Sequence, residues 1–294
     1  MMILVGDNPF HGISHLSQER SRSRGAKIHA TEYATQLVTV SLDNGAEGFM
    51  FSVSETTLLI LKMLREKKVN RKLKLYAIVP YAYEYVRLAT QTGISGLAQK
   101  VAKQMFFSAN LKAAGMGIKG FLLSDPMELL KTYLLYEITR LKSTIKDQDE
   151  IESILLHEII TEIGLALDLD WFFKSYIDFL SELKIKPGFE TRNFAFFVNK
   201  FKQWGINFSD LVIASPFNRI GFQMNPSRIE CEKALLDVPT ATVIAMSVLA
   251  AGYLKPNEAI GYVRSLSHLK GVVVGVSNES QACQTFKLLS SKYV

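Results

Sequence analysis

The sequence predicts a (β/α)8 TIM barrel of the α/β class, because short apolar runs alternate with longer amphipathic segments along the chain. Eight of these runs have the length and composition of strands, which is the number that a closed barrel requires. Several are apolar without alternation, as expected for parallel strands that helices cover on both faces. A doubly wound open sheet is the alternative, but no predicted strand is followed by a G-x-G-x-x-G turn.

The predicted strands are separated by segments whose apolar residues recur with a period near 3.6, which indicates helices. Asn44 and Gly45 close the first of these helices, and Ser54 is placed to cap the second. In chain order the strands are MILVG, EGFMFSV, LKLYAIV, SILLHEI, KPGFE, DLVIASP, ATVIAMSV and GVVVGVS. The expected helices cover residues 30–43, 55–68, 168–184, 193–204, 226–236, 256–267 and 278–290.

The stretch between the third and fourth predicted strands is much longer than a usual connection. We interpret residues 92–150, approximately, as an enlarged helical insertion on the barrel wall. Within it, Asp125 and Pro126 predict the start of a long helix, and STIKDQDE predicts a surface loop behind that helix. No linker rich in proline or glycine interrupts the chain, so residues 1–294 are expected to form a single domain.

Composition indicates a globular protein with a large core, since 48% of the residues are hydrophobic and 21% are charged. The net charge is +6, but basic residues alternate with acidic ones, which argues against nucleic acid as a partner. The densest basic stretch follows the first strand and favours a small anionic substrate. It comprises Arg20, Arg22, Arg24 and Lys27.

The sequence also predicts a cytoplasmic protein without a membrane partner. No apolar run approaches the ~20 residues of a membrane span, and no targeting segment precedes the first strand. Cys231 and Cys283 lack metal-ligand spacing and a disulfide framework, as expected in a reducing compartment. The sequence leaves the oligomeric state open.

The part of the chain after residue 150 carries a more specific pattern than the part before it. Its motifs are SILLHEI, KIKPGFETRN, VIAMSVLAAGYLKPNEAIGYV and VVVGVSNESQACQTF. In order and spacing they resemble the fourth, fifth, seventh and eighth strands of the aldo-keto reductases, in which a histidine ends the fourth strand and a phosphate-binding loop follows the eighth. The resemblance covers roughly half of the chain. It implies the barrel fold, and NADPH-dependent reduction of carbonyls as the family activity.

Most residues that this family uses for reduction are absent. The family tetrad consists of aspartate, tyrosine, lysine and histidine. Here Ser52 stands at the aspartate position, Val79 or Pro80 at the lysine position, and no tyrosine follows the second strand. Only His157 matches the tetrad. Because the tyrosine donates a proton and the lysine lowers its pKa, hydride transfer without them loses its acid.

The predicted cofactor loop is also incomplete. Asn278 replaces the arginine that would pair with a 2′-phosphate, and Thr285 replaces the asparagine that would face adenine. Gly275 and Ser277 still lead into a helix N-terminus, where backbone N–H groups bind phosphate. Gly275, Ser277 and Asn278 are therefore candidate cofactor residues, and NADP stays an alternative cofactor.

Barrel enzymes place their active residues at the carboxyl ends of the strands and in the loops that follow. The stretch GDNPFHG after the first strand is also typical of a simple turn, in which Asp or Asn caps the backbone and Pro fixes φ. The candidate catalytic residues are Asp7, His11, His157 and Glu190, and the candidate substrate ligands are Asn8, Tyr81, Arg192 and Asn218. The same acids and histidines offer a divalent metal site as an alternative, although no closely spaced pair anchors one, so no metal ligand is assigned.

Three functions are open at this point. The first is acid/base chemistry on a small, anionic metabolite, such as isomerisation, elimination or hydrolysis. In it Asp7 or Glu190 is the base, His11 or His157 the acid, and Arg192 a substrate clamp together with Asn8. The second is NADPH-dependent reduction with an altered proton donor, His157 or Tyr81. The third is a non-catalytic relative that binds a ligand or a partner chain.

Overall fold

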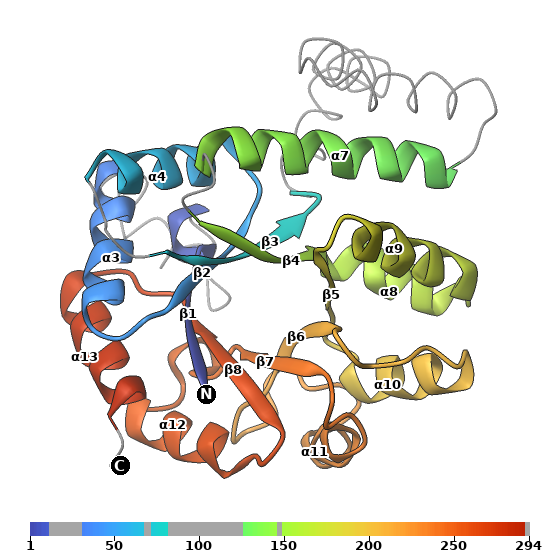
Figure 1. Ribbon diagram of the computed structural model, residues 1–294. Coiled ribbons are helices and arrows are strands. Elements are labelled where there is room, and N and C mark those ends of the chain that lie inside the picture. The colour runs from blue at the N-terminus through green and yellow to red at the C-terminus, as the bar shows by residue number, and fades with distance from the viewer. Residues whose placement is uncertain (12–30, 68–71, 82–125, 146–148, 292–294) are drawn as a thin grey trace, which may run out of the picture.

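The computed structural model describes residues 1–11, 31–67, 72–81, 126–145 and 149–291. In these residues, parallel strands form a closed barrel in the order β1 to β8, and helices surround it (Figure 1). The pairing of β1 with β8, which sets Leu4 opposite Val273, closes the barrel. The predicted (β/α)8 fold is confirmed. The strands are β1 Met2–Gly6, β2 Gly48–Ser52, β3 Lys74–Val79, β4 Glu150–Leu156, β5 Lys186–Glu190, β6 Val212–Pro216, β7 Thr242–Met246 and β8 Leu269–Val274.

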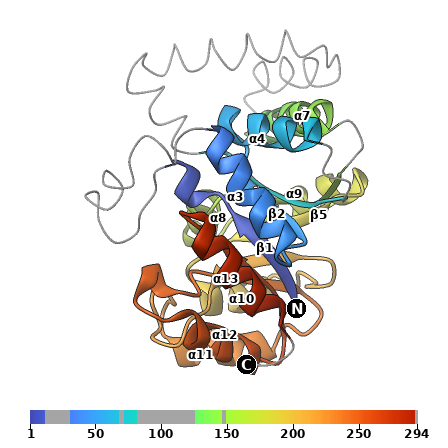
Figure 2. The ribbon, with the colours of Figure 1, turned by 90° about the vertical axis from the view of Figure 1, so that its left-hand side faces the viewer.

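The predicted helices are present to within a few residues of their expected ends. Ser54 caps α4 as expected, because its Oγ accepts a hydrogen bond from the Thr57 N–H at 3.2 Å. Figure 2 shows α3 and α13 side by side on the barrel wall. The helices are α3 Thr31–Asp43, α4 Glu55–Glu66, α7 Pro126–Ile145, α8 Glu158–Ala166, α9 Asp170–Glu182, α10 Phe194–Gln203, α11 Arg228–Leu236, α12 Pro256–Ser265 and α13 Glu279–Ser290, with 3-10 turns η1 Asn8–His11 and η2 Ala250–Gly252.

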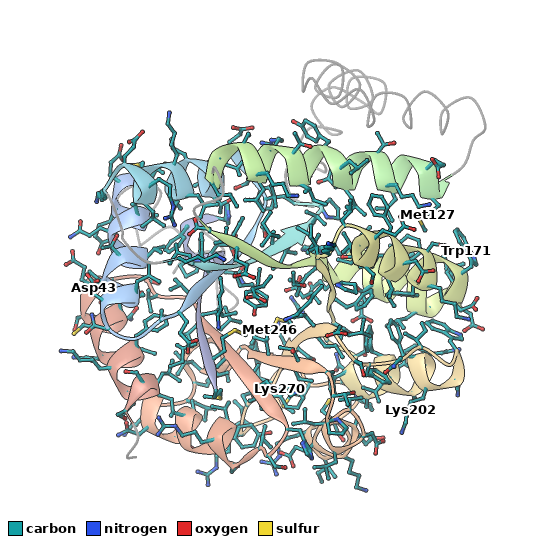
Figure 3. All side chains as sticks on the ribbon, in the orientation of Figure 1. Asp43, Met127, Trp171, Lys202, Met246 and Lys270 are labelled. Carbon is teal, nitrogen blue, oxygen red and sulfur yellow. The ribbon has the colours of Figure 1, made fainter. Side chains whose placement is uncertain are left out.

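Strand alternation divides the apolar side chains into an inner and an outer core. The outer core lies between strands and helices, whereas the inner core fills the barrel below its mouth. Met246, which packs against the inner core, is labelled near the centre of Figure 3, and Trp171 and Lys202 lie at the periphery. The inner core comprises Leu4, Met50, Tyr76, Ile78, Leu155, Val212, Ala214, Ile244 and Val273.

The fourth strand ends earlier than its apolar run predicts. β4 stops at Leu156, and His157 caps α8, a helix that the sequence analysis did not predict. The His157 Nδ1 accepts a hydrogen bond from the Ile159 N–H at 3.2 Å, which satisfies one of the donors that every helix start leaves open. The assignment of His157 to a strand was therefore wrong.

Only part of the predicted insertion at 92–150 belongs to the described residues. Residues 82–125, which include Asp125, lie outside the described residues, as does the basic stretch from 20 to 27. The long helix α7 does begin at Pro126. The surface loop predicted at residues 143–150 is wrong at both ends, since residues 143–145 belong to α7 and Glu150 begins β4. Asp149 is buried, forms an ion pair with Arg65 and accepts the Leu73 N–H at 2.9 Å. That the chain forms a single domain stays a prediction.

Within the described ranges, none of the helices is both long enough and apolar enough to span a membrane.

Candidate functional site

A cavity of about 390 Å³ lies at the carboxyl ends of the strands. Residues from the ends of β1, β5, β7 and β8 contribute to its walls, so the site forms where barrel enzymes place their chemistry. The predicted site residues that line the cavity are Asp7, Asn8, Glu190, Arg192, Gly275 and Ser277.

Glu190 ends β5 and follows the inward-facing Gly188 by two residues, so its carboxyl group faces the barrel mouth. Burial raises the pKa of this carboxyl from 4.5 to about 7, and the neighbouring carboxylates of Glu158 and Asp7 add to the increase. The Glu158 N–H, 3.3 Å from Oε2, and the Arg192 guanidinium act in the opposite direction. Near neutral pH, Glu190 is therefore able both to accept and to donate a proton.

Asp7 connects the ends of the first two strands. It is 3% exposed, and its Oδ2 accepts hydrogen bonds from the Ser52 N–H at 2.7 Å and from His11 Nε2 at 3.0 Å. The Tyr81 ring packs against the His11 ring, with centroids 4.9 Å apart. The Phe10 N–H closes the η1 turn on the Asp7 carbonyl at 2.7 Å. Residues 6–11, GDNPFH, thus form a turn that also sets a carboxylate in the cavity wall.

His157 directly follows β4, and its N–H donates to the carbonyl of Val79, the last residue of β3, at 2.8 Å. Burial lowers the pKa of the imidazole, Glu158 and Asp7 raise it, and Arg192 lowers it, with a net decrease. The ring is therefore neutral at pH 7. Because Nδ1 accepts the Ile159 N–H, the proton of the neutral ring resides on Nε2, which is left as a hydrogen-bond donor.

Arg192 lines the cavity and forms an ion pair with Glu158, with 2.5 Å between Nε and Oε2. Glu158 reaches the site because β4 has already ended and α8 turns its first residue toward the mouth. The guanidinium charge is therefore balanced by a carboxylate of the same site. This reduces the attraction of Arg192 for a substrate anion.

The structure adds Glu162, which the sequence analysis did not select. Its carboxylate accepts hydrogen bonds from Thr191 Oγ1 at 2.7 Å, from the Arg192 N–H at 2.9 Å and from Asn193 Nδ2 at 2.7 Å. Glu162 thus holds the turn after β5. A search restricted to strand ends misses it, because it lies in α8. Its spacing of four from Glu158 becomes informative only once α8 is recognised as a helix.

Some predicted residues lie away from the cavity. Asn218 is fully buried, and its amide group closes the loop after β6 through Phe222 O and Phe222 N–H, both at 2.8 Å. The structure therefore does not support Asn218 as a substrate ligand. The lining residues of the described cavity also do not include His11, Tyr81, His157 and Asn278.

The residues after β8 do not fit the predicted phosphate site. The Ser277 N–H donates to Gln281 Oε1 at 3.1 Å, and the Gln281 N–H donates to the Asn278 side chain at 2.9 Å. Glu279 adds a carboxylate to the first turn of α13, where it opposes phosphate. Asn278 is therefore an N-cap, and among the described residues the N–H groups of Ser277 and Gln281 are already occupied.

Gly275 has a packing role in this region. A Cβ at this position would lie 2.7 Å from Cδ of Pro9, so glycine permits η1 to approach β8. Among the described residues, there is no cluster of three or more His, Cys, Asp or Glu side chains that could bind a metal ion.

No protein-family model and no curated protein sequence matches this chain. Two solved structures from Pseudomonas aeruginosa, each described as a "putative aldo-keto reductase", superpose on it with a TM-score of 0.57 at 10% sequence identity. The match covers 98% of this chain and 89% of each of those chains. At this identity the likeness concerns the fold, and the chain is a (β/α)8 barrel like these two structures.

Proposed function

We propose that this chain is a barrel enzyme that transfers protons on a small polar metabolite, with Glu190 as the central acid/base group. The observation that supports the proposal is the position of Glu190 in the cavity wall with a pKa of about 7. A group that titrates near the working pH populates both protonation states, so it removes a proton and returns it at little energetic cost.

In the proposed reaction, the ionised Glu190 removes a proton from a carbon next to a substrate carbonyl group. Negative charge then develops on the carbonyl oxygen. Arg192 and Asn8, which line the cavity, are proposed to orient the substrate and to donate hydrogen bonds toward that oxygen. Return of the proton to a neighbouring atom completes an isomerisation, and loss of a leaving group completes an elimination. Asp7 has a supporting role here, because its Oδ2 is already bound to Ser52 and His11.

The charge of the described site favours an uncharged substrate. The carboxyl groups of Asp7 and Glu158 and the guanidinium of Arg192 all act on Glu190, and Glu158 already balances that guanidinium. The anionic substrate expected from the sequence rested on the basic stretch from 20 to 27, which lies outside the described residues, and on Arg192, which Glu158 balances. We therefore propose a neutral hydroxy-carbonyl compound, such as a free sugar, in place of a phosphorylated one.

Solvent exchange tests this proposal whichever product the reaction forms. The purified protein is incubated in D2O with a panel of free aldoses and ketoses and with their phosphorylated counterparts, and deuterium at the carbon next to the carbonyl is followed by NMR. We expect exchange with a free sugar, reduced at least ~100-fold in Glu190→Gln, as for loss of a general base. Equal exchange by both proteins overturns the role of Glu190, and a preference for the phosphorylated compounds overturns the neutral substrate.

NADPH-dependent reduction is the second candidate, because the fold matches two structures that are each described as a "putative aldo-keto reductase". In this version His157 or Tyr81 donates the proton. The occupied N–H groups of Ser277 and Gln281 count against it. Titration with NADPH separates the two candidates: saturable quenching of tryptophan fluorescence at micromolar cofactor supports reduction, and unchanged fluorescence supports the proton-transfer enzyme.

A further inference from the structure

The Glu162 carboxylate accepts four hydrogen bonds from residues 191–193, two from backbone N–H groups and two from side chains. Besides Thr191 Oγ1, the Arg192 N–H and Asn193 Nδ2, the Asn193 N–H also lies 3.3 Å from Glu162 Oε1. Both carboxylate oxygens are engaged, Oε1 by three donors and Oε2 by one. A single side chain of α8 therefore fixes the residues 191–193 that directly follow Glu190.

The same helix also fixes the side chain that emerges from this turn. Glu158 and Glu162 are four residues apart on α8 and so project from one helix face. Glu158 binds the Arg192 guanidinium, while Glu162 binds the Arg192 N–H. On the other side, the Arg192 carbonyl accepts the Asn225 N–H at 3.1 Å. Arg192 is thus held at its side chain and at both polar groups of its backbone.

We propose that Glu162 is the positioning residue of the site: by holding the turn 191–193, it determines where Glu190 and Arg192 stand in the cavity. Glu162 itself does not line the cavity and is not a catalytic residue. The inference rests on the proposed function for its catalytic consequence, but its structural part is tested without a substrate. Without Glu162, the turn moves away from α8 and water reaches the Glu190 carboxyl group.

A double-mutant cycle tests this inference. Urea unfolding midpoints are measured at pH 5 and pH 8.5 for the parent protein and for Glu190→Gln, and then for the same pair in a Glu162→Ala background. In the parent background, we expect the midpoint difference between the pair to grow with pH, because only the glutamate ionises. In the Glu162→Ala background, we expect this growth to fall to less than half.

Two further variants keep the test decisive. Glu162→Gln retains the size of the side chain and one acceptor oxygen, so it replaces the alanine variant if that protein does not fold. Glu182→Ala, at the exposed end of α9, is the control. In this background, we expect the midpoint difference to increase with pH as much as in the parent background.

The outcomes separate this inference from the proposed function. If the midpoint difference increases with pH equally in both backgrounds, the positioning role is overturned. Glu162 is then only a stabilising residue, while the acid/base role of Glu190 stands. If the midpoint difference does not increase with pH in the parent background, the inference and the proposed function are both overturned, since Glu190 would then have an ordinary carboxyl environment. The inference is supported if the pH-dependent increase of the midpoint difference is lost in the Glu162→Ala background and kept in the Glu182→Ala background.

Discussion

Substitution of Glu190 by glutamine is expected to stabilise the fold at alkaline pH. The Glu190 pKa is about 7 in the folded protein against an ordinary 4.5, and at 1.36 kcal/mol per pKa unit this corresponds to about 3 kcal/mol. Because the folded pKa is the higher one, the folded state favours the protonated acid. Below pH 4.5 both states are protonated, and the wild-type protein carries no penalty. Between pH 4.5 and 7 the unfolded state ionises first, so stability falls, and above pH 7 the full penalty is present.

The assay is equilibrium unfolding in urea, followed by the fluorescence of Trp171 and Trp204. The free energy of unfolding is determined for both proteins at half-unit intervals from pH 4.5 to 8.5. We expect similar stabilities at pH 4.5 and a Glu190→Gln variant that is more stable by up to about 3 kcal/mol at pH 8.5.

A matched control separates this effect from general changes of charge. Glu182→Gln removes an exposed carboxylate at the end of α9 and is expected to leave the pH dependence of stability unchanged. The reasoning is refuted if the Glu190→Gln and wild-type curves run parallel over the whole pH range, since Glu190 would then titrate alike in the folded and unfolded states. Stabilisation that appears at acid pH instead of alkaline pH would contradict the sign.

Three further predictions concern the barrel mouth and the inner core. Asp7→Ala leaves the buried Ser52 N–H without its acceptor and is expected to cost about 2 kcal/mol in urea unfolding; an unchanged midpoint would contradict this. His157→Gln is expected to weaken the loss of stability that the parent shows below about pH 6.5, because the low imidazole pKa penalises protonation in the fold; identical acid denaturation curves would refute it. Gly188→Ala sets a Cβ 2.6 Å from Leu155 Cγ and is expected to destabilise the barrel by about 1 to 3 kcal/mol; calorimetry that shows no decrease in Tm would exclude the clash.

The candidate site was predictable from the sequence where it depends on strand ends. Asp7, Glu190 and Arg192 follow apolar runs, and a closed parallel barrel brings the carboxyl ends of all its strands to one mouth. Asn218 satisfies the same rule but turns inward to close its own loop, because an asparagine amide also pairs well with nearby backbone. Strand position therefore selects candidates, and local hydrogen bonding decides which of them reach the cavity.

The boundary between β4 and α8 had to come from the structure. In sequence, Ile and Leu surround His157 on both sides, so the apolar run alone does not show where the strand stops. In the fold, the imidazole caps the helix, and this change of direction brings Glu158 and Glu162 to the turn after β5. Glu162 is missed when α8 is taken as a continuation of the strand.

The sequence by itself determined the barrel, because the alternation of apolar strands and amphipathic helices is a local property that does not depend on long-range contacts. It also determined which polar residues stand at the strand ends. Only the tertiary structure decided the chemistry of these residues. The raised pKa of Glu190 arises from burial, from Glu158 at the start of α8 and from Asp7 after β1, and these groups approach one another only when the barrel closes.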